Sequence, residues 1–305
     1  MTPTHAPTRP GPDAPALRAA LDAEWREIDS DTCGRIGYYA ETAPSGTPLL
    51  LVHSLNAAPS AMEMRPLFDH YRGKRPVVAL DQPGFGRSER GERPDTPELL
   101  ARAVEEVAAA AFDAAPDVIA LSLGAEIAAR AMLTRPEAWK SLAMISPTGF
   151  ALRQPPGDLV ADGVEWALGG RLVRDRLFRA LTRPGTVRFF LARNCVDAPD
   201  PDLVDYAVET ARQPGAAFGP IRFLSGRLFT REARTRLYDR LSVPILVLFD
   251  EDPNVGFETL ERWIARRATR RAERIAPSKG LPHWERLAPC VEALERFWTE
   301  TDGGD

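Results

Sequence analysis

The 305-residue sequence has only three cysteines, Cys33, Cys195 and Cys290, and no C-x-x-C pair. Cysteines that are odd in number and far apart argue against a disulfide framework and are typical of a reducing compartment. We therefore expect free thiols and a cytoplasmic protein. No apolar run approaches the ~18 residues that a membrane helix needs. The sequence accordingly predicts no membrane partner.

An excess of positive charge is also lacking. The chain has 39 Lys and Arg against 43 Asp and Glu, which gives a net charge of −4. Domains that bind nucleic acid usually carry a strong basic field, so no nucleic-acid partner is expected. The apolar fraction of 44% and charged fraction of 27% are typical of a globular protein. The length fits two domains, or one large α/β domain with an insertion.

Residues 1–15 contain five prolines and no hydrophobic signal core, so we expect a disordered tail there. After it, apolar residues at helical spacing predict a short helix over 16–28, and residues 34–41 are typical of a strand. Continuous apolar runs bounded by turn residues then indicate strands buried on both faces. These runs lie at 48–53, 77–80, 117–121, 142–146 and 244–249, with a weaker one at 272–276.

Helical patterns separate these runs, at about 60–71, 95–113, 124–134, 256–267 and 286–299. Alternating strands and helices predict a doubly wound, mostly parallel α/β sheet. The alternation stops over residues 150–237, which are rich in Arg, Leu and Phe and show no buried strand. We expect this segment to be a helical cap over the carboxyl edge of the sheet. The core is then made of residues 16–149 and 238–300.

One turn in this pattern is a candidate for chemistry. In V-I-A-L-S-L-G-A-E, residues 118–126, a buried strand meets Ser122, then Gly124 and Ala125, then a helix. This is the setting of a nucleophile elbow, written G-x-S-x-G, in which the neighbours of the serine must be small. Ala120 stands where the first glycine is usual, but alanine is the next smallest residue. The start of the helix also points backbone N–H groups towards developing negative charge.

A nucleophilic serine needs a base, and the chain has only four histidines. His53 and His283 both follow predicted strands and can reach the carboxyl edge of the sheet. Acids in F-D-E-D-P, at 249–253, follow another strand and can orient a histidine. The order Ser122, Asp252, His283 then favours His283 as the base. Asp252 is the preferred acid and Asp250 the alternative.

Four motifs taken together resemble the α/β-hydrolase superfamily, in its branch with a cap. They are L-L-V-H-S-L-N at 50–56, D-Q-P-G-F-G-R-S at 81–88, A-L-S-L-G at 120–124, and F-D-E-D-P with G-L-P-H at 280–283. The resemblance spans about residues 34–300. It implies an α/β-hydrolase fold, that is, a doubly wound, mostly parallel sheet with a helical cap inserted after the sixth strand.

The resemblance also implies an oxyanion hole formed by the backbone N–H groups of Leu55 and Leu123. Ser54 departs from the family's usual glycine, so Ser54 and Asn56 either add side-chain donors or tie down the loop. His53 is expected to orient this loop, Asp81 and Arg87 to hold the 81–88 turn, and Glu126 to interact with the helix dipole. Residues expected either to contact the substrate or to pack in the core include Leu55, Leu121, Leu123, Phe150, Trp166, Phe189, Phe190 and Trp284.

The predicted activity is that of a serine carboxylesterase (EC 3.1.1) acting on a small or medium, mostly apolar ester through an acyl-enzyme. No metal or organic cofactor is expected, and a homodimer is compatible with the sequence. Two alternatives stay open. The same triad can serve C–C bond, lactone or thioester cleavage, or a cyclase or lyase step in secondary metabolism. The protein can also be a hydrolase-like binding module with little turnover.

Overall fold

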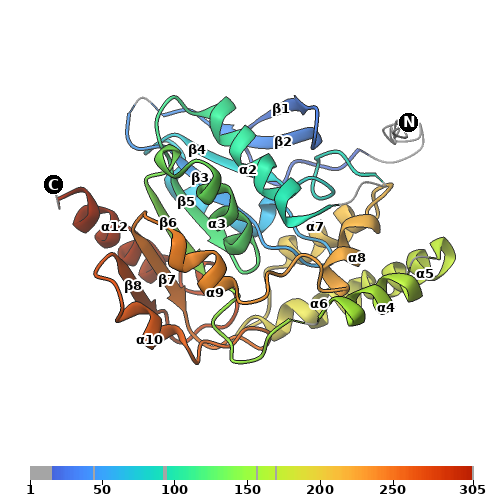
Figure 1. Ribbon diagram of the computed structural model, residues 1–305. Helices are drawn as coiled ribbons and strands as arrows, with labels where there is room; N and C mark the ends of the chain where they lie inside the picture. The colour runs from blue at the N-terminus through green and yellow to red at the C-terminus, as the bar shows by residue number, and fades with distance from the viewer. Residues whose placement is uncertain (1–15, 44, 92–94, 156, 169, 304–305) are drawn as a thin grey trace.

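An eight-stranded β-sheet runs through the centre of the protein, and helices lie on both of its faces (Figure 1). The computed structural model describes residues 16–43, 45–91, 95–155, 157–168 and 170–303, so the expected tail at 1–15 lies outside the described residues. The strand order is β1-β2-β4-β3-β5-β6-β7-β8. The strands are β1 (Glu24–Ser30), β2 (Gly34–Glu41), β3 (Leu49–Val52), β4 (Val77–Asp81), β5 (Asp117–Leu121), β6 (Ser141–Ile145), β7 (Ile245–Phe249) and β8 (Arg270–Arg274).

Strands β3 to β8 pair in parallel, whereas β2 is antiparallel to β1 and to β4. All residues of β3, β4, β5 and β6 are buried, which is why their sequences are continuous apolar runs. Successive side chains of a strand point to opposite faces. Leu50 and Val118 accordingly pack in one core and Leu51 and Ile119 in the other.

Helices cover each of these cores. Residues of α2 (Pro97–Ala111) and α3 (Gly124–Thr134) pack in the core that contains Leu50, joined by α10 (Leu260–Ile264). On the opposite face, α1 (Arg65–Tyr71) and α12 (Leu287–Asp302) pack against Leu51. This three-layer arrangement confirms the doubly wound α/β fold, and it directs the carboxyl ends of the parallel strands to one edge.

Between β6 and β7 the chain forms helices, and the described residues there contain no strand. These helices are α4 (Asp158–Leu168), α5 (Arg171–Leu181), α6 (Pro184–Arg193), α7 (Pro201–Ala211), α8 (Phe218–Leu224) and α9 (Ala233–Arg236). The insertion therefore begins after the sixth strand. In Figure 1, α4 and α5 lie at the far side of the view from α12. No described helix is both long and apolar enough to cross a membrane.

The buried carboxylate of Glu126 anchors the end of this insertion. One of its oxygens accepts a hydrogen bond from the hydroxyl of Thr148 and the other from the backbone N–H of Thr230, at 2.7 Å. Thr148 follows β6 and Thr230 precedes α9, so Glu126 holds the two ends of the insertion together at the start of α3. Burial raises the pKa of Glu126 to about 6. Glu126 therefore does more than interact with the helix dipole.

The helix predicted over 16–28 is wrong, because residues 16–23 form no helix and β1 begins at Glu24, where it forms an antiparallel hairpin with β2. Trp25 lies directly opposite Tyr39, with ring centroids 4.8 Å apart. Cross-strand aromatic pairs of this kind stabilise a hairpin. The helical spacing is thus overridden by pairing with a strand that comes later in the chain. The helix expected over 256–267 is also shorter, being restricted to α10.

Candidate active site

Ser122 occupies a strained turn between β5 and α3. Its φ is 51°, a left-handed conformation that is uncommon for residues other than glycine. The backbone N–H of Ser122 donates to the carbonyl of Ile145 at 2.8 Å, which continues the pairing of β5 with β6 into the turn. The side chain is half-buried. A sharp strand–turn–helix geometry of this type presents a serine hydroxyl at the carboxyl edge of a sheet.

Gly124 is required by the close approach of the turn to the end of β3. A β-carbon at this position would lie 2.3 Å from the carbonyl oxygen of His53 and 3.3 Å from that of Val52. Ala120, in contrast, is fully buried in β5, opposite Val52 and Met144. The two small residues of A-L-S-L-G therefore serve different purposes. Gly124 permits backbone contact, whereas Ala120 packs between neighbouring strands.

Two backbone N–H groups beside the elbow are available for a ligand. Leu123 immediately precedes α3, and Leu55 lies in the loop after β3. Within the described ranges, neither N–H donates a hydrogen bond to the protein. Both side chains are almost completely buried. Unused N–H groups of this kind are suited to stabilise an oxyanion.

The buried carboxylate of Glu63 holds the loop after β3. It accepts hydrogen bonds from the backbone N–H of Ser54 at 2.9 Å, the hydroxyl of Ser54 at 3.0 Å and the side-chain amide of Asn56 at 2.8 Å. Burial raises the pKa of Glu63, and these hydrogen bonds partly offset that effect. Through these hydrogen bonds, Ser54 and Asn56 tie the loop to Glu63.

The sequence reasoning missed Glu63. The sequence feature that could have identified it is an acidic residue in A-M-E-M, a segment whose other residues are all apolar. Glu63 lies in the 3₁₀ turn η1 (Ala61–Met64), and all four residues of that turn are buried. A buried carboxylate is costly unless it is hydrogen-bonded, so an acid inside an apolar run points to a polar partner nearby.

His53 connects the loop after β3 to the turn after β4. Its Nδ1 donates to the carbonyl of Ser54 at 2.5 Å, and its Nε2 accepts from the N–H of Gln82 at 2.9 Å. These partners define a neutral tautomer, and burial lowers the pKa of His53 to about 4. Both nitrogens are in use, so His53 has the orienting role expected of it.

Asp81 holds the D-Q-P-G-F-G-R-S turn, as expected. Its carboxylate accepts from the backbone N–H groups of Ala61 and Arg87, both at 2.8 Å. Gly86, with a φ of 51°, lies so close that a β-carbon there would be 1.9 Å from the Asp81 carboxyl carbon. Burial raises the pKa of Asp81 to about 6. The guanidinium of Arg87 lies over the ring of Trp25, at 4.3 Å from its centroid.

His283 is fully buried in the short helix α11 (Pro282–Glu285). Its Nε2 donates to the backbone carbonyl of Glu63 at 2.7 Å, and the indole N–H of Trp284 donates to the same oxygen, also at 2.7 Å. Its Nδ1 has no hydrogen-bond partner among the residues that the structure describes. Burial lowers the pKa of His283 to about 4. The imidazole is therefore neutral and retains an unused lone pair, as a general base requires.

The two candidate acids differ in their surroundings. Asp250 is engaged by the guanidinium of Arg274 at 2.6 Å and by the N–H of Ser278 at 2.8 Å. Among the residues that the structure describes, Asp252 accepts hydrogen bonds only from the N–H groups of Asn254 and Val255, in its own loop. Burial raises the pKa of Asp252.

The carboxylate of Asp252 lies beside the loop that carries the histidine. A β-carbon on Gly280, three residues before His283, would be 2.9 Å from its Oδ2. In the described part of the chain, no hydrogen bond joins His283 to Asp252 or to Ser122. The acid and histidine loops are adjacent, and His283 contacts Glu63, which holds the oxyanion loop.

The residues expected to contact substrate occupy different environments. Phe150 is fully buried and packs against Tyr238 and Trp263, so it belongs to the core and offers no wall to a ligand. Leu121 is also buried, in the core on the α1 side of the sheet. Trp166, with 87% of its surface exposed, lies on α4. Trp284 is half-buried beside His283.

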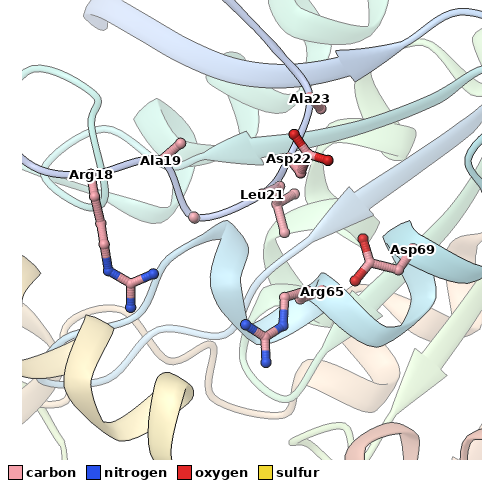
Figure 2. A pocket seen from close by; sticks show the side chains of 8 residues that line it. Arg18, Ala19, Leu21, Asp22, Ala23, Arg65 and Asp69 are labelled. Atoms are coloured by element: carbon pink, nitrogen blue, oxygen red, sulfur yellow. The ribbon is translucent and has the colours of Figure 1, made fainter.

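A surface hollow of about 410 Å³ lies beside the start of α1 (Figure 2), and Ser122 does not line it. Arg18 and Arg65 line it, but both guanidiniums pair with Asp202, and they have further partners in Glu209 and Asp200. This pairing removes the free positive charge that an anion site would need. Elsewhere in the described ranges, no group of three or more His, Cys, Asp and Glu residues could hold a metal ion.

Comparison with known proteins supports the same interpretation of the fold. Residues 49–293 match the profile described as the alpha/beta hydrolase family. The chain therefore belongs to the alpha/beta hydrolase family. The match begins at β3 and ends in α12, so it includes the elbow, the helical insertion between β6 and β7, and both loops of the candidate site. A comparison with curated proteins gave no sequence match.

Solved structures are similar over nearly the whole chain. A probable hydrolytic enzyme from Pseudomonas aeruginosa is 17% identical, with a TM-score of 0.72 over 91% of this chain and 95% of that one. Naproxen esterase from Bacillus subtilis is 22% identical, with a TM-score of 0.69 over 92% and 93%. An N-acyl homoserine lactonase is 21% identical, with a TM-score of 0.67 over 92% and 98%. At these identities the likeness shows the fold alone.

Proposed function

We propose that the protein is a serine hydrolase that cleaves the carboxylic ester of a small or medium, mostly apolar substrate through an acyl-enzyme on Ser122. The observation that carries this proposal is the left-handed backbone of Ser122 at the junction of β5 with α3. A strained serine at the start of a helix, beside two unused N–H groups, has the arrangement that acyl transfer requires.

The proposed reaction assigns one role to each residue. Ser122 attacks the ester carbonyl while His283 takes its proton, and the N–H groups of Leu55 and Leu123 stabilise the oxyanion. The protonated His283 then gives its proton to the leaving alcohol. Water, activated by His283, attacks the acyl-enzyme and releases the acid. Asp252 is the proposed partner of the imidazolium.

His283 must move its hydrogen bond for this reaction. In the structure its Nε2–H is directed to the carbonyl of Glu63. We propose that the imidazole leaves this carbonyl when substrate binds, so that one nitrogen faces Ser122 and the other faces Asp252. Gly280 supports this step, because its lack of a side chain leaves the Asp252 carboxylate adjacent to the histidine loop.

Covalent labelling tests this function directly. A fluorophosphonate probe should label the wild type rapidly, and Ser122→Ala should abolish the label. Ser146→Ala is the matched control, because Ser146 also has a positive φ, of 43°, and a buried hydroxyl, but it follows β6 and has no assigned role. Ser146→Ala should keep the label.

A substrate panel then identifies the bond that is cleaved. Esters of increasing acyl length, thioesters and lactones are assayed with the wild type and with Ser122→Ala. We expect the highest kcat/KM for an ester, and loss of at least about 1,000-fold in Ser122→Ala. Preferred turnover of lactones or thioesters would show that the protein cleaves that bond and not a simple ester. A wild type with neither label nor turnover would show a binding protein instead.

A further inference from the structure

Helices α5 and α6 of the cap segment concentrate the positive charge of the protein. Residues 171–193 contain a single acid, Asp175, whereas the chain as a whole has a net charge of −4. The arginines of this stretch are Arg171, Arg174, Arg176, Arg179, Arg183, Arg188 and Arg193. A strongly basic segment on an acidic protein indicates an anionic partner.

Five of these arginines are exposed, namely Arg176, Arg179, Arg183, Arg188 and Arg193. None of the five forms an ion pair with a residue that the structure describes. By contrast, Arg18 and Arg65, in the hollow of Figure 2, are neutralised by acids. The charge of α5 and α6 is therefore available at the surface.

The same helices expose apolar side chains. Phe189 and Phe190 are adjacent in α6, are 58% and 48% exposed, and have ring centroids 5.5 Å apart. Val173 and Leu177 are exposed on α5. The large exposed hydrophobic residues of the described chain all fall within 152–224; they are Leu152, Trp166, Val173, Leu177, Phe189, Phe190, Val196 and Leu224. Apolar surface concentrated on one segment is typical of an interaction site.

Other residues of α5 and α6 hold these helices in place. Phe178 of α5 is buried with Ala211 and Ala216, and Val187 of α6 is buried with Val204 and Val208. The exposed phenylalanines and arginines are thus not a core face that lacks its neighbour. They remain exposed on two helices that are already packed, through Phe178 and Val187, against the rest of the insertion.

We infer that this outer surface, the cap face of α5 and α6, docks on the surface of an anionic lipid bilayer. Exposed aromatic residues interleaved with arginine suit the boundary between headgroups and acyl chains, and unpaired guanidiniums suit anionic headgroups. The expectation of no membrane partner rested on the lack of a spanning segment. A helix pair that lies on the bilayer needs none, so the two observations are compatible.

Vesicle sedimentation tests this inference. The full-length Ser122→Ala protein is mixed with vesicles of phosphatidylcholine, with and without phosphatidylglycerol, so that the result does not depend on the proposed hydrolysis. We expect binding only where phosphatidylglycerol is present, and loss of binding at high salt. Phe189→Ser with Phe190→Ser, and separately Arg188→Glu with Arg193→Glu, should each weaken binding by at least about tenfold.

The matched control is Arg262→Glu with Arg266→Glu, which reverses two exposed arginines near α10 and should leave binding unchanged. Circular dichroism melts check that each variant is folded. Failure of wild type to bind phosphatidylglycerol vesicles, or equal loss in the control, overturns the inference. So does binding that depends on the arginines but not on the phenylalanines, because this marks a general polyanion site. A dimer that the phenylalanine variant dissociates, without vesicle binding, shows that a second copy covers the face.

Discussion

At the scale of single residues, the two candidate acids differ in their hydrogen-bond partners. Asp250 is held by Arg274 and the N–H of Ser278, whereas the hydrogen bonds of Asp252 within the described ranges come from its own loop. Sequence order alone left both residues open, because they are two positions apart at the end of the same strand. The hydrogen-bond partners of Asp250 come from a segment more than 20 residues later in the chain, and they favour a structural role for Asp250.

Exchanging each acid for its amide tests this distinction. We expect Asp252→Asn to lower kcat/KM by about 1,000- to 10,000-fold with little change in stability, because the imidazolium loses its partner. We expect Asp250→Asn to retain activity and to lose only a little stability, since Arg274 is largely exposed and the pair is screened by solvent. Steady-state kinetics and urea denaturation of both variants measure these effects. Inactive Asp250→Asn beside active Asp252→Asn would reverse the assignment.

At the scale of elements, the contact between the elbow and the end of β3 determines the geometry of the site. The start of α3 touches the backbone of His53, the residue that begins the oxyanion loop. Glu63 then links that loop to His283. A shift of α3 relative to β3 would therefore disturb the proposed nucleophile, Ser122, and the N–H groups proposed for the oxyanion together.

Gly124→Ala tests this contact. The added methyl would lie 2.3 Å from a backbone oxygen that cannot move aside, so we expect a loss of about 2 kcal/mol or more in stability and at least about 100-fold in kcat/KM. Gly163→Ala in α4 is the control, because a β-carbon there meets nothing within 4 Å. The control should gain about 0.5–1 kcal/mol through helix propensity. Normal activity in Gly124→Ala would contradict the role given to this contact.

At the scale of the whole molecule, burial controls the protonation of the site. Burial lowers the pKa of both His53 and His283 to about 4, below the ordinary value of 6.5. The stability that comes from burying the neutral rings is present above pH 6.5 and is lost as the pH falls through about 4. Asp81 and Glu126, whose pKa values burial raises to about 6, act in the opposite sense. Their buried carboxyl groups must ionise as the pH rises through 6, and this lowers the stability of the folded state.

The pH dependence of activity follows from His283. The base is active when neutral, so the acid limb of kcat/KM should lie near pH 4 to 5, below the ordinary histidine value. A pH profile with a short-chain ester between pH 3.5 and 8, with activity remeasured after return to pH 7, separates titration from unfolding. A limb at pH 6.5 or above would show that His283 is well solvated during catalysis.

Local sequence by itself determined much of this protein. Residues of β3 to β6 are buried on both faces, so each had to be a continuous apolar run, and these strands were predictable to within a residue or two. The elbow at Ser122 was also predictable, because the small residues that its turn needs are neighbours in the chain. Residues 24–30 were not, because pairing with β2 outweighs their helical spacing.

Only the tertiary structure decided how the separate loops meet. Glu63 lies in a turn of its own, yet its side chain holds Ser54 and Asn56, and its carbonyl receives His283, 220 positions later. The basic, aromatic surface of α5 and α6 arises in the same way, since packing on α7 decides which side remains exposed. Such contacts depend on which distant segments the folded chain brings together, and a local sequence pattern does not contain that information.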